Sequence, residues 1–101
     1  MTALRDLPNI GEVAASELEA AGIGDGEELR AQGAVRAALR LRAAGFEVCR
    51  SKLGGLEGAV RGIRWHLIPA EERRALWLDF EAFEAGEELA QGRRRQARAG
   101  S

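Results

Sequence analysis

The segment Leu7–Ile23, LPNIGEVAASELEAAGI, constrains the fold of this 101-residue chain more than any other. Pro8 fixes its own φ and disfavours the helical region for Leu7, so a preceding helix has to end there. Gly11 has no Cβ, which lets the turning backbone approach a neighbour closely. The apolar positions that follow recur at helical spacing, at Ala14, Leu18 and Ala21. Gly22 then suits a left-handed helix end. The segment therefore predicts a helix-hairpin-helix unit.

The hairpin turn is the first candidate binding site, formed by Leu7, Pro8, Asn9, Ile10 and Gly11. In DNA-binding hairpins, backbone N–H groups of the turn and of the next helix N-terminus face a phosphate. Here the surrounding residues are acids, namely Asp6, Glu12, Glu17 and Glu19. Because these acids repel phosphate, we expect the hairpin to serve packing, with DNA contact as the alternative.

Composition and local signals predict a small all-α domain. Two prolines and no tyrosine fit helices better than a sheet, and Asp25 followed by Glu28 matches a capping box. Phe46–Cys49 alternates like a strand but has no partner, so we interpret it as a connector. The expected helices cover about 3–6, 11–21, 26–32, 34–44, a segment capped by Ser51, and 69–85. Together they make a bundle of five to six helices with a helix-hairpin-helix-like N-terminal half over residues 1–86, followed by a disordered basic tail over residues 87–101.

The helix after Ser51 contains an unusual number of glycines, at Gly54, Gly55, Gly58 and Gly62. Each glycine inside a helix costs about 1 kcal/mol relative to alanine. Such a cost indicates close helix–helix contact, where a Cβ would collide with a neighbour.

Charge is divided along the chain although its net value is −1. Residues 31–66 hold seven bases, at Arg36, Arg40, Arg42, Arg50, Lys52, Arg61 and Arg64, against two acids. Residues 1–30 and 67–92 are acidic, and the last nine residues are basic. The charged segments either neutralise one another in the fold or across a dimer, or form a basic surface for an anionic partner.

Nothing in the sequence forms a catalytic or metal-binding set. His66 and Cys49 are the only residues of their types, and we expect a structural imidazole and a small buried thiol. The spacing matches neither a zinc site nor a phosphate-binding glycine loop. We therefore expect a protein that is not an enzyme and has no cofactor. Without a leader or an apolar membrane span, a cytoplasmic location is expected.

The last helix contains the candidate residues for self-association, Trp77, Phe80 and Phe83. One helical face can dock Leu76, Phe80 and Phe83 on the core, which leaves Trp77 about 100° away around the helix. Trp77 then either lies flat on its own domain or contributes to a two-fold homodimer contact.

These residues resemble the C-terminal domain of the TfoX/Sxy family of competence regulators. The resemblance covers residues 3–80 and rests on LPNIG, Leu18, Gly22-Ile23, Leu29, Gly33-Ala34, Leu56-Glu57-Gly58-Ala59, Gly62, Trp65 and Leu67-Ile68-Pro69. It implies an all-helical, stand-alone copy of a domain that regulates bacterial genes, among them those for DNA uptake.

Two functions follow as hypotheses. The first is a non-enzymatic regulatory module that contacts proteins of the transcription machinery. The second is a weak, non-specific DNA-binding module that uses the seven bases of residues 36–64 and the arginine-rich tail.

Overall fold

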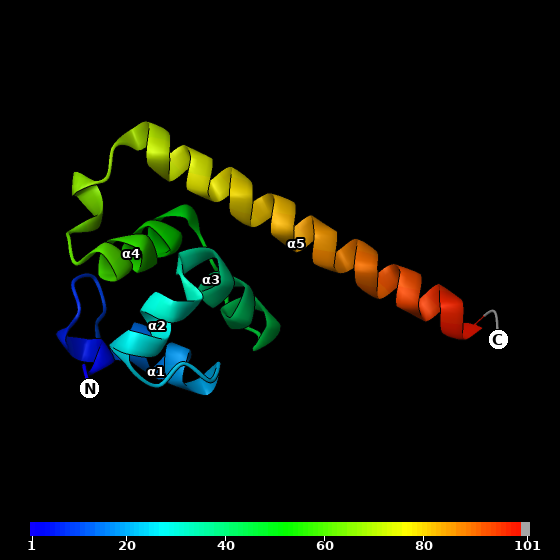
Figure 1. Cartoon of the computed structure of the whole chain (residues 1–101), viewed down its shortest axis with the longest axis horizontal. Coiled ribbons are helices and arrows are strands. Elements are labelled where there is room, and N and C mark those ends of the chain that lie inside the picture. The colour runs from blue at the N-terminus through cyan, green and yellow to red at the C-terminus, as the bar shows by residue number, and fades with distance from the viewer. Residues whose placement is uncertain (100–101) are drawn as a thin grey trace.

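Seven helical segments follow one another within residues 1–99 (Figure 1). The structure, a computed structural model, describes the backbone of residues 1–99 and the side chains of residues 1–86. The elements are the 3-10 helix η1 (Leu4–Asp6), α1 (Glu12–Ala20), α2 (Gly26–Gln32), α3 (Ala34–Ala43), α4 (Arg50–Arg61), the 3-10 helix η2 (Trp65–Leu67) and α5 (Ala70–Ala99). Five α-helices and no strand occur within residues 1–99, which confirms the predicted all-α bundle.

Most helix boundaries lie where local signals place them. Asp25 Oδ1 accepts a hydrogen bond from Glu28 N at 2.8 Å, and Glu28 Oε2 accepts one from Gly24 N at 3.2 Å. This reciprocal cap begins α2 as predicted. Gly22, with a φ of +90°, follows the end of α1. Phe46–Cys49 is the predicted connector and belongs to no helix or strand.

Two boundaries differ from the prediction. Cys49 is the N-cap of α4, and Ser51 lies inside the first turn. α5 continues past the expected end at residue 85 to Ala99, because a single glycine such as Gly86 costs a helix only about 1 kcal/mol. The assignment of residues 87–101 to a disordered tail stays a prediction, since side chains beyond Gly86 and residues 100–101 lie outside the described part.

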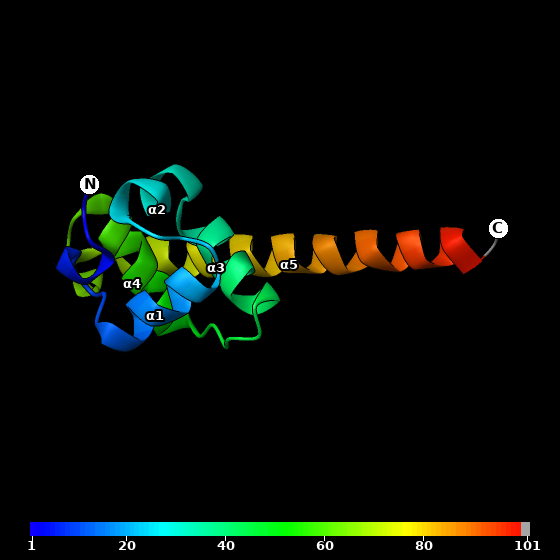
Figure 2. The same ribbon diagram turned by 90° about the horizontal axis from the view of Figure 1, so that it is seen from below.

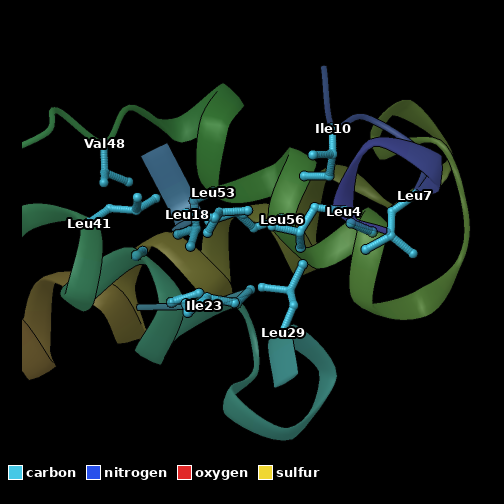
Figure 3. Packing of buried hydrophobic residues seen from close by; sticks show 14 of the residues in the cluster. Leu4, Leu7, Ile10, Leu18, Ile23, Leu29, Leu41, Val48, Leu53 and Leu56 are labelled. Carbon is cyan, nitrogen blue, oxygen red and sulfur yellow. The ribbon is translucent and has the colours of Figure 1, made fainter. Parts of the chain in front are cut away.

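The core lies among the first four α-helices, with α5 packed against α3 and α4. Figure 3 shows its aliphatic side chains pointing toward one another from separate elements. Leu18, Leu29 and Leu41 are fully buried, and each such side chain contributes about 1.5–3 kcal/mol by leaving water. Phe80 is the α5 side chain that enters the core, with 1% of its surface exposed.

The chain start is attached to α2 through Thr2. Thr2 N and Oγ1 donate to the two carboxylate oxygens of Glu27 at 2.9 and 2.7 Å, and Gly26 N donates to Thr2 O at 2.8 Å. The backbone bond and then the hydroxyl bond lower the pKa of Glu27 to about 2, since both favour the charged carboxylate. The ionised Glu27 therefore fixes the N-terminus at neutral pH.

α5 extends well past the other helices. Its N-terminal half packs on α3 and α4, and its C-terminal half projects beyond them (Figures 1 and 2). Although α5 has 30 residues, no helix of the described part is long and apolar enough to cross a membrane.

Candidate functional site

The hairpin turn is fixed to the domain by its apolar side chains. Leu7 and Ile10 are 7% and 6% exposed, and Ile10 N donates to Leu7 O at 3.3 Å. The left-handed residue is Asn9, with a φ of +69°, a conformation that asparagine tolerates. Gly11 is extended, and no atom lies within 4 Å of where its Cβ would be. The predicted close approach at Gly11 is therefore wrong.

The side chain of Asn9 ties the turn to the end of α4 and the chain that follows. Its Nδ2 donates to Ile63 O at 3.0 Å and to Gly55 O at 3.3 Å. Its Oδ1 accepts a hydrogen bond from Trp65 N at 3.2 Å. Both amide protons and the carbonyl are thus used, and the turn's one polar side chain is bonded inside the fold.

Gly58 leaves the space that Asn9 occupies. A Cβ on Gly58 would lie 2.5 Å from Asn9 Nδ2 and 2.6 Å from Ile63 O, closer than atoms can approach. This confirms that a glycine of α4 marks a close contact. The contact is with the hairpin turn and the chain after α4, and not with another helix as expected. Gly62 instead follows the end of α4 in the left-handed conformation, with a φ of +77°.

Acids surround the hairpin turn and neutralise its nearest base. Arg5 Nε lies 2.9 Å from Glu12 Oε1, and Arg5 Nη1 lies 3.2 Å from Glu19 Oε1. The hydrogen bond and charge of Glu12, followed by those of Glu19, raise the pKa of Arg5. A shallow cavity of about 640 Å³ beside the turn is lined by the turn itself and by Arg5, Asp6 and Arg64. The surface outside the turn therefore carries mixed charge.

The seven bases of residues 36–64 are distributed over several places. Three pair with acids: Arg42 with Glu84 at 2.7 Å, Lys52 with Glu17, and Arg61 with Glu72 at 3.1 Å. Arg50 lies over the Trp77 ring, 5.6 Å from its centroid. Arg64 lines the hairpin cavity, and Arg36 and Arg40 line a groove beside α3. These pairs join the basic segment to both acidic segments of the chain.

The three candidate aromatic residues have different surroundings. Trp77 packs on its own domain, with its ring centroid 5.3 Å from that of the buried Phe80. Phe83 is 59% exposed, so the expectation that it docks on the core beside Leu76 and Phe80 is wrong. Phe83 and Ala43 line the same groove, and the next residue, Glu84, pairs with Arg42 near the C-terminal end of α3.

An apolar groove of about 730 Å³ lies between α3 and α5, and we call it the α3–α5 groove. Its walls are formed mainly by Val35 and Leu39 from α3 and by Leu76 and Phe83 from α5. The charged residues that line it are Arg36 and Arg40, whose side chains are exposed, and Glu57 of α4. The sequence does not predict this groove, because its position depends on how two helices that are distant in sequence pack against each other.

His66 and Cys49 have separate positions on the surface. His66 is exposed and lies edge-on to Trp65, with the ring centroids 6.4 Å apart. Cys49 is exposed, so the prediction of a buried thiol is wrong; the neighbouring Val48 enters the core instead. Within the described residues, no three or more His, Cys, Asp or Glu side chains are grouped to hold a metal ion.

Comparisons with known proteins give one family match and similar solved structures. The family model described as the TfoX C-terminal domain matches residues 1–80. A crystal structure of an uncharacterized protein from Listeria monocytogenes, in a triclinic form, is similar with 41% identity and a TM-score of 0.73, over 80% of this chain and 92% of that one. A tetragonal form of a Listeria monocytogenes protein of unknown function is similar with 42% identity and a TM-score of 0.71, over 78% and 96%. No curated protein matches the chain.

Proposed function

The chain belongs to the TfoX C-terminal domain family, and on this basis we propose that it is a regulatory binding module of the bacterial competence type. It is not an enzyme, needs no cofactor and works in the cytoplasm. It acts mainly through contacts with proteins of the transcription machinery, and these contacts change the expression of genes that include those for DNA uptake.

The inward bonding of Asn9 is the observation that carries this proposal. The hairpin turn uses its polar side chain on Gly55, Ile63 and Trp65, so that side chain is not available to a ligand. The acids Asp6, Glu12 and Glu19 lie beside the turn in sequence or space. Arg5 pairs with Glu12 and Glu19, so the repulsion that disfavours a phosphate within about 8 Å at physiological salt comes mainly from Asp6. A protein surface with both basic and acidic side chains suits this mixed-charge surface better.

Charge reversal beside the hairpin tests the proposal in the source bacterium. Asp6→Lys changes an exposed acid at the turn, and Glu71→Lys changes an exposed acid at the start of α5 as the matched control. Transcripts of the DNA-uptake genes should fall with Asp6→Lys and with deletion of the gene, and stay at the wild-type level with Glu71→Lys. Unchanged transcripts after gene deletion contradict the regulatory function, and equal effects of the two variants contradict the role of the hairpin surface.

A nucleic-acid-binding module is the second candidate. The observation that favours it is that Arg36, Arg40 and Arg64 are exposed and have no ion pair with the acids of the described part. Such scattered bases, with the arginine-rich tail, support electrostatic affinity of about 10⁻⁴–10⁻⁶ M at physiological salt. This affinity carries no sequence preference.

A further inference from the structure

We propose that the α3–α5 groove is filled by α5 of a second copy of this chain, in a two-fold antiparallel pair. Phe83 of each copy enters the groove of the other. The inference concerns self-association and does not depend on the function proposed above.

The groove presents apolar surface that the described part of the chain leaves open. Phe83 is 59% exposed, and Val35, Leu39 and Leu76 are only partly buried. A contiguous apolar surface with an exposed aromatic side chain usually marks an interaction site. Arg36 and Arg40 also line the groove, but the surface between them and α5 is formed by apolar side chains. The occupant is therefore an apolar helix face.

In a second copy, α5 supplies the exposed apolar side chain of Phe83. The helix has 30 residues, and among its described side chains Phe80 enters the core and Glu84 pairs with Arg42. Residues 85–99 correspond to about 22 Å of helix that projects past the domain (Figures 1 and 2). A helical segment of this length is marginal in water by itself. Packing against another copy would stabilise this projecting segment of α5.

Two-fold symmetry places Phe83 near the axis. Phe83 lines the groove of its own copy near the C-terminal end of α3, so an antiparallel partner helix brings its own Phe83 to the same place. A closed dimer of this kind uses one patch on both copies. Each Phe83 then enters the groove of the other copy. The two copies therefore make the same contact through the same residue.

Charge complementarity fixes the antiparallel direction. α3 and α5 run toward the same end of the molecule (Figure 1). The partner chain after its Phe83 therefore runs back along α3, toward Arg40 and then Arg36. In sequence, the charged residues between Phe83 and Arg93 are acids only: Glu84, which pairs with Arg42 of its own copy, and then Glu87 and Glu88. An acidic segment thus passes the two exposed bases of the groove, which a parallel pair would not achieve.

Sedimentation velocity on the full chain, from micromolar to submillimolar concentration, tests the pair. The wild type should be a dimer, and Phe83→Ser should raise its dissociation constant at least about tenfold. Leu78→Ser is the matched control, because Leu78 is an α5 side chain of similar exposure, 53%, that does not line the groove. Arg36→Glu with Arg40→Glu should weaken the dimer in the same direction as Phe83→Ser. Helical circular dichroism verifies that each variant folds, since all four positions are exposed.

The outcomes separate cleanly. Loss of the dimer with Phe83→Ser and its retention with Leu78→Ser support the groove as the interface. A wild type that stays monomeric at submillimolar concentration overturns the pair. A dimer that survives Phe83→Ser, or that Leu78→Ser also dissociates, places the contact on another face and overturns the assignment to the groove.

Discussion

Replacing Gly58 by alanine should destabilise the domain, although alanine is the better helix former. The helix itself gains about 1 kcal/mol from the change. The new Cβ, however, would lie 2.5 Å from Asn9 Nδ2 and 2.6 Å from Ile63 O. Overpacking of this kind costs about 1–3 kcal/mol, and each Asn9 hydrogen bond that is displaced costs about 0.5–1.5 kcal/mol more. We expect a net loss of about 3 kcal/mol.

The matched control is Gly54→Ala in the same helix. A Cβ on Gly54 meets only Arg73 Cδ, at an ordinary 3.8 Å, so this variant should be as stable as the wild type or up to about 1 kcal/mol more stable. Thermal unfolding followed by circular dichroism distinguishes the two. The melting midpoint should fall by about 12–24 °C for Gly58→Ala, given about 4–8 °C per kcal/mol for a domain of this size.

A double-mutant cycle with Asn9→Gly identifies the cause. Glycine tolerates the positive φ of position 9 and removes the three side-chain hydrogen bonds. Gly58→Ala should therefore destabilise the Asn9→Gly background less than the wild type, because one of the two clashing atoms is gone. Additive effects, or a Gly58→Ala variant that melts like Gly54→Ala, would refute the packing argument.

Two further predictions concern the first turn of α2. Glu27 has a pKa of about 2 in the fold against an ordinary 4.5, so its bonds to Thr2 stabilise the fold above pH 4.5 and this contribution is lost as the pH falls toward 2. The melting midpoint of Glu27→Gln should lie below that of the wild type at neutral pH, and the difference should shrink across this acidic range; a constant difference contradicts the linkage. Asp25→Ala removes the N-cap of α2 and should cost about 1 kcal/mol in urea unfolding, whereas no loss would show that the cap bond contributes nothing.

The sequence predicts those structural features that are formed by residues close to one another along the chain. Asp25 and Glu28 lie three residues apart, so the cap of α2 was visible as a spacing. Gly22 follows the last apolar position of its helix and ends α1 as expected. Helical periodicity also placed Leu76 and Phe80 on the domain side of α5.

Features that depend on distant partners were not predicted. Asn9 looked like an ordinary turn residue, because the groups it binds lie 46 to 56 residues further along the chain. The glycines of α4 indicated a close approach, but not that the hairpin turn makes it. Periodicity alone could not show that α5 runs past the edge of the domain at Phe83 and leaves that ring uncovered.

The central claim is that the hairpin has a packing role and that the domain binds proteins. Titration of labelled double-stranded DNA, followed by fluorescence anisotropy, tests this claim most directly. At physiological salt the full chain should bind no tighter than about 10⁻⁶ M, equally on unrelated sequences, with affinity that falls steeply as salt rises. Removal of residues 92–101 should abolish most of the binding seen at low salt. Nanomolar binding to one DNA sequence at about 0.15 M salt, far above the non-specific range, would contradict the account.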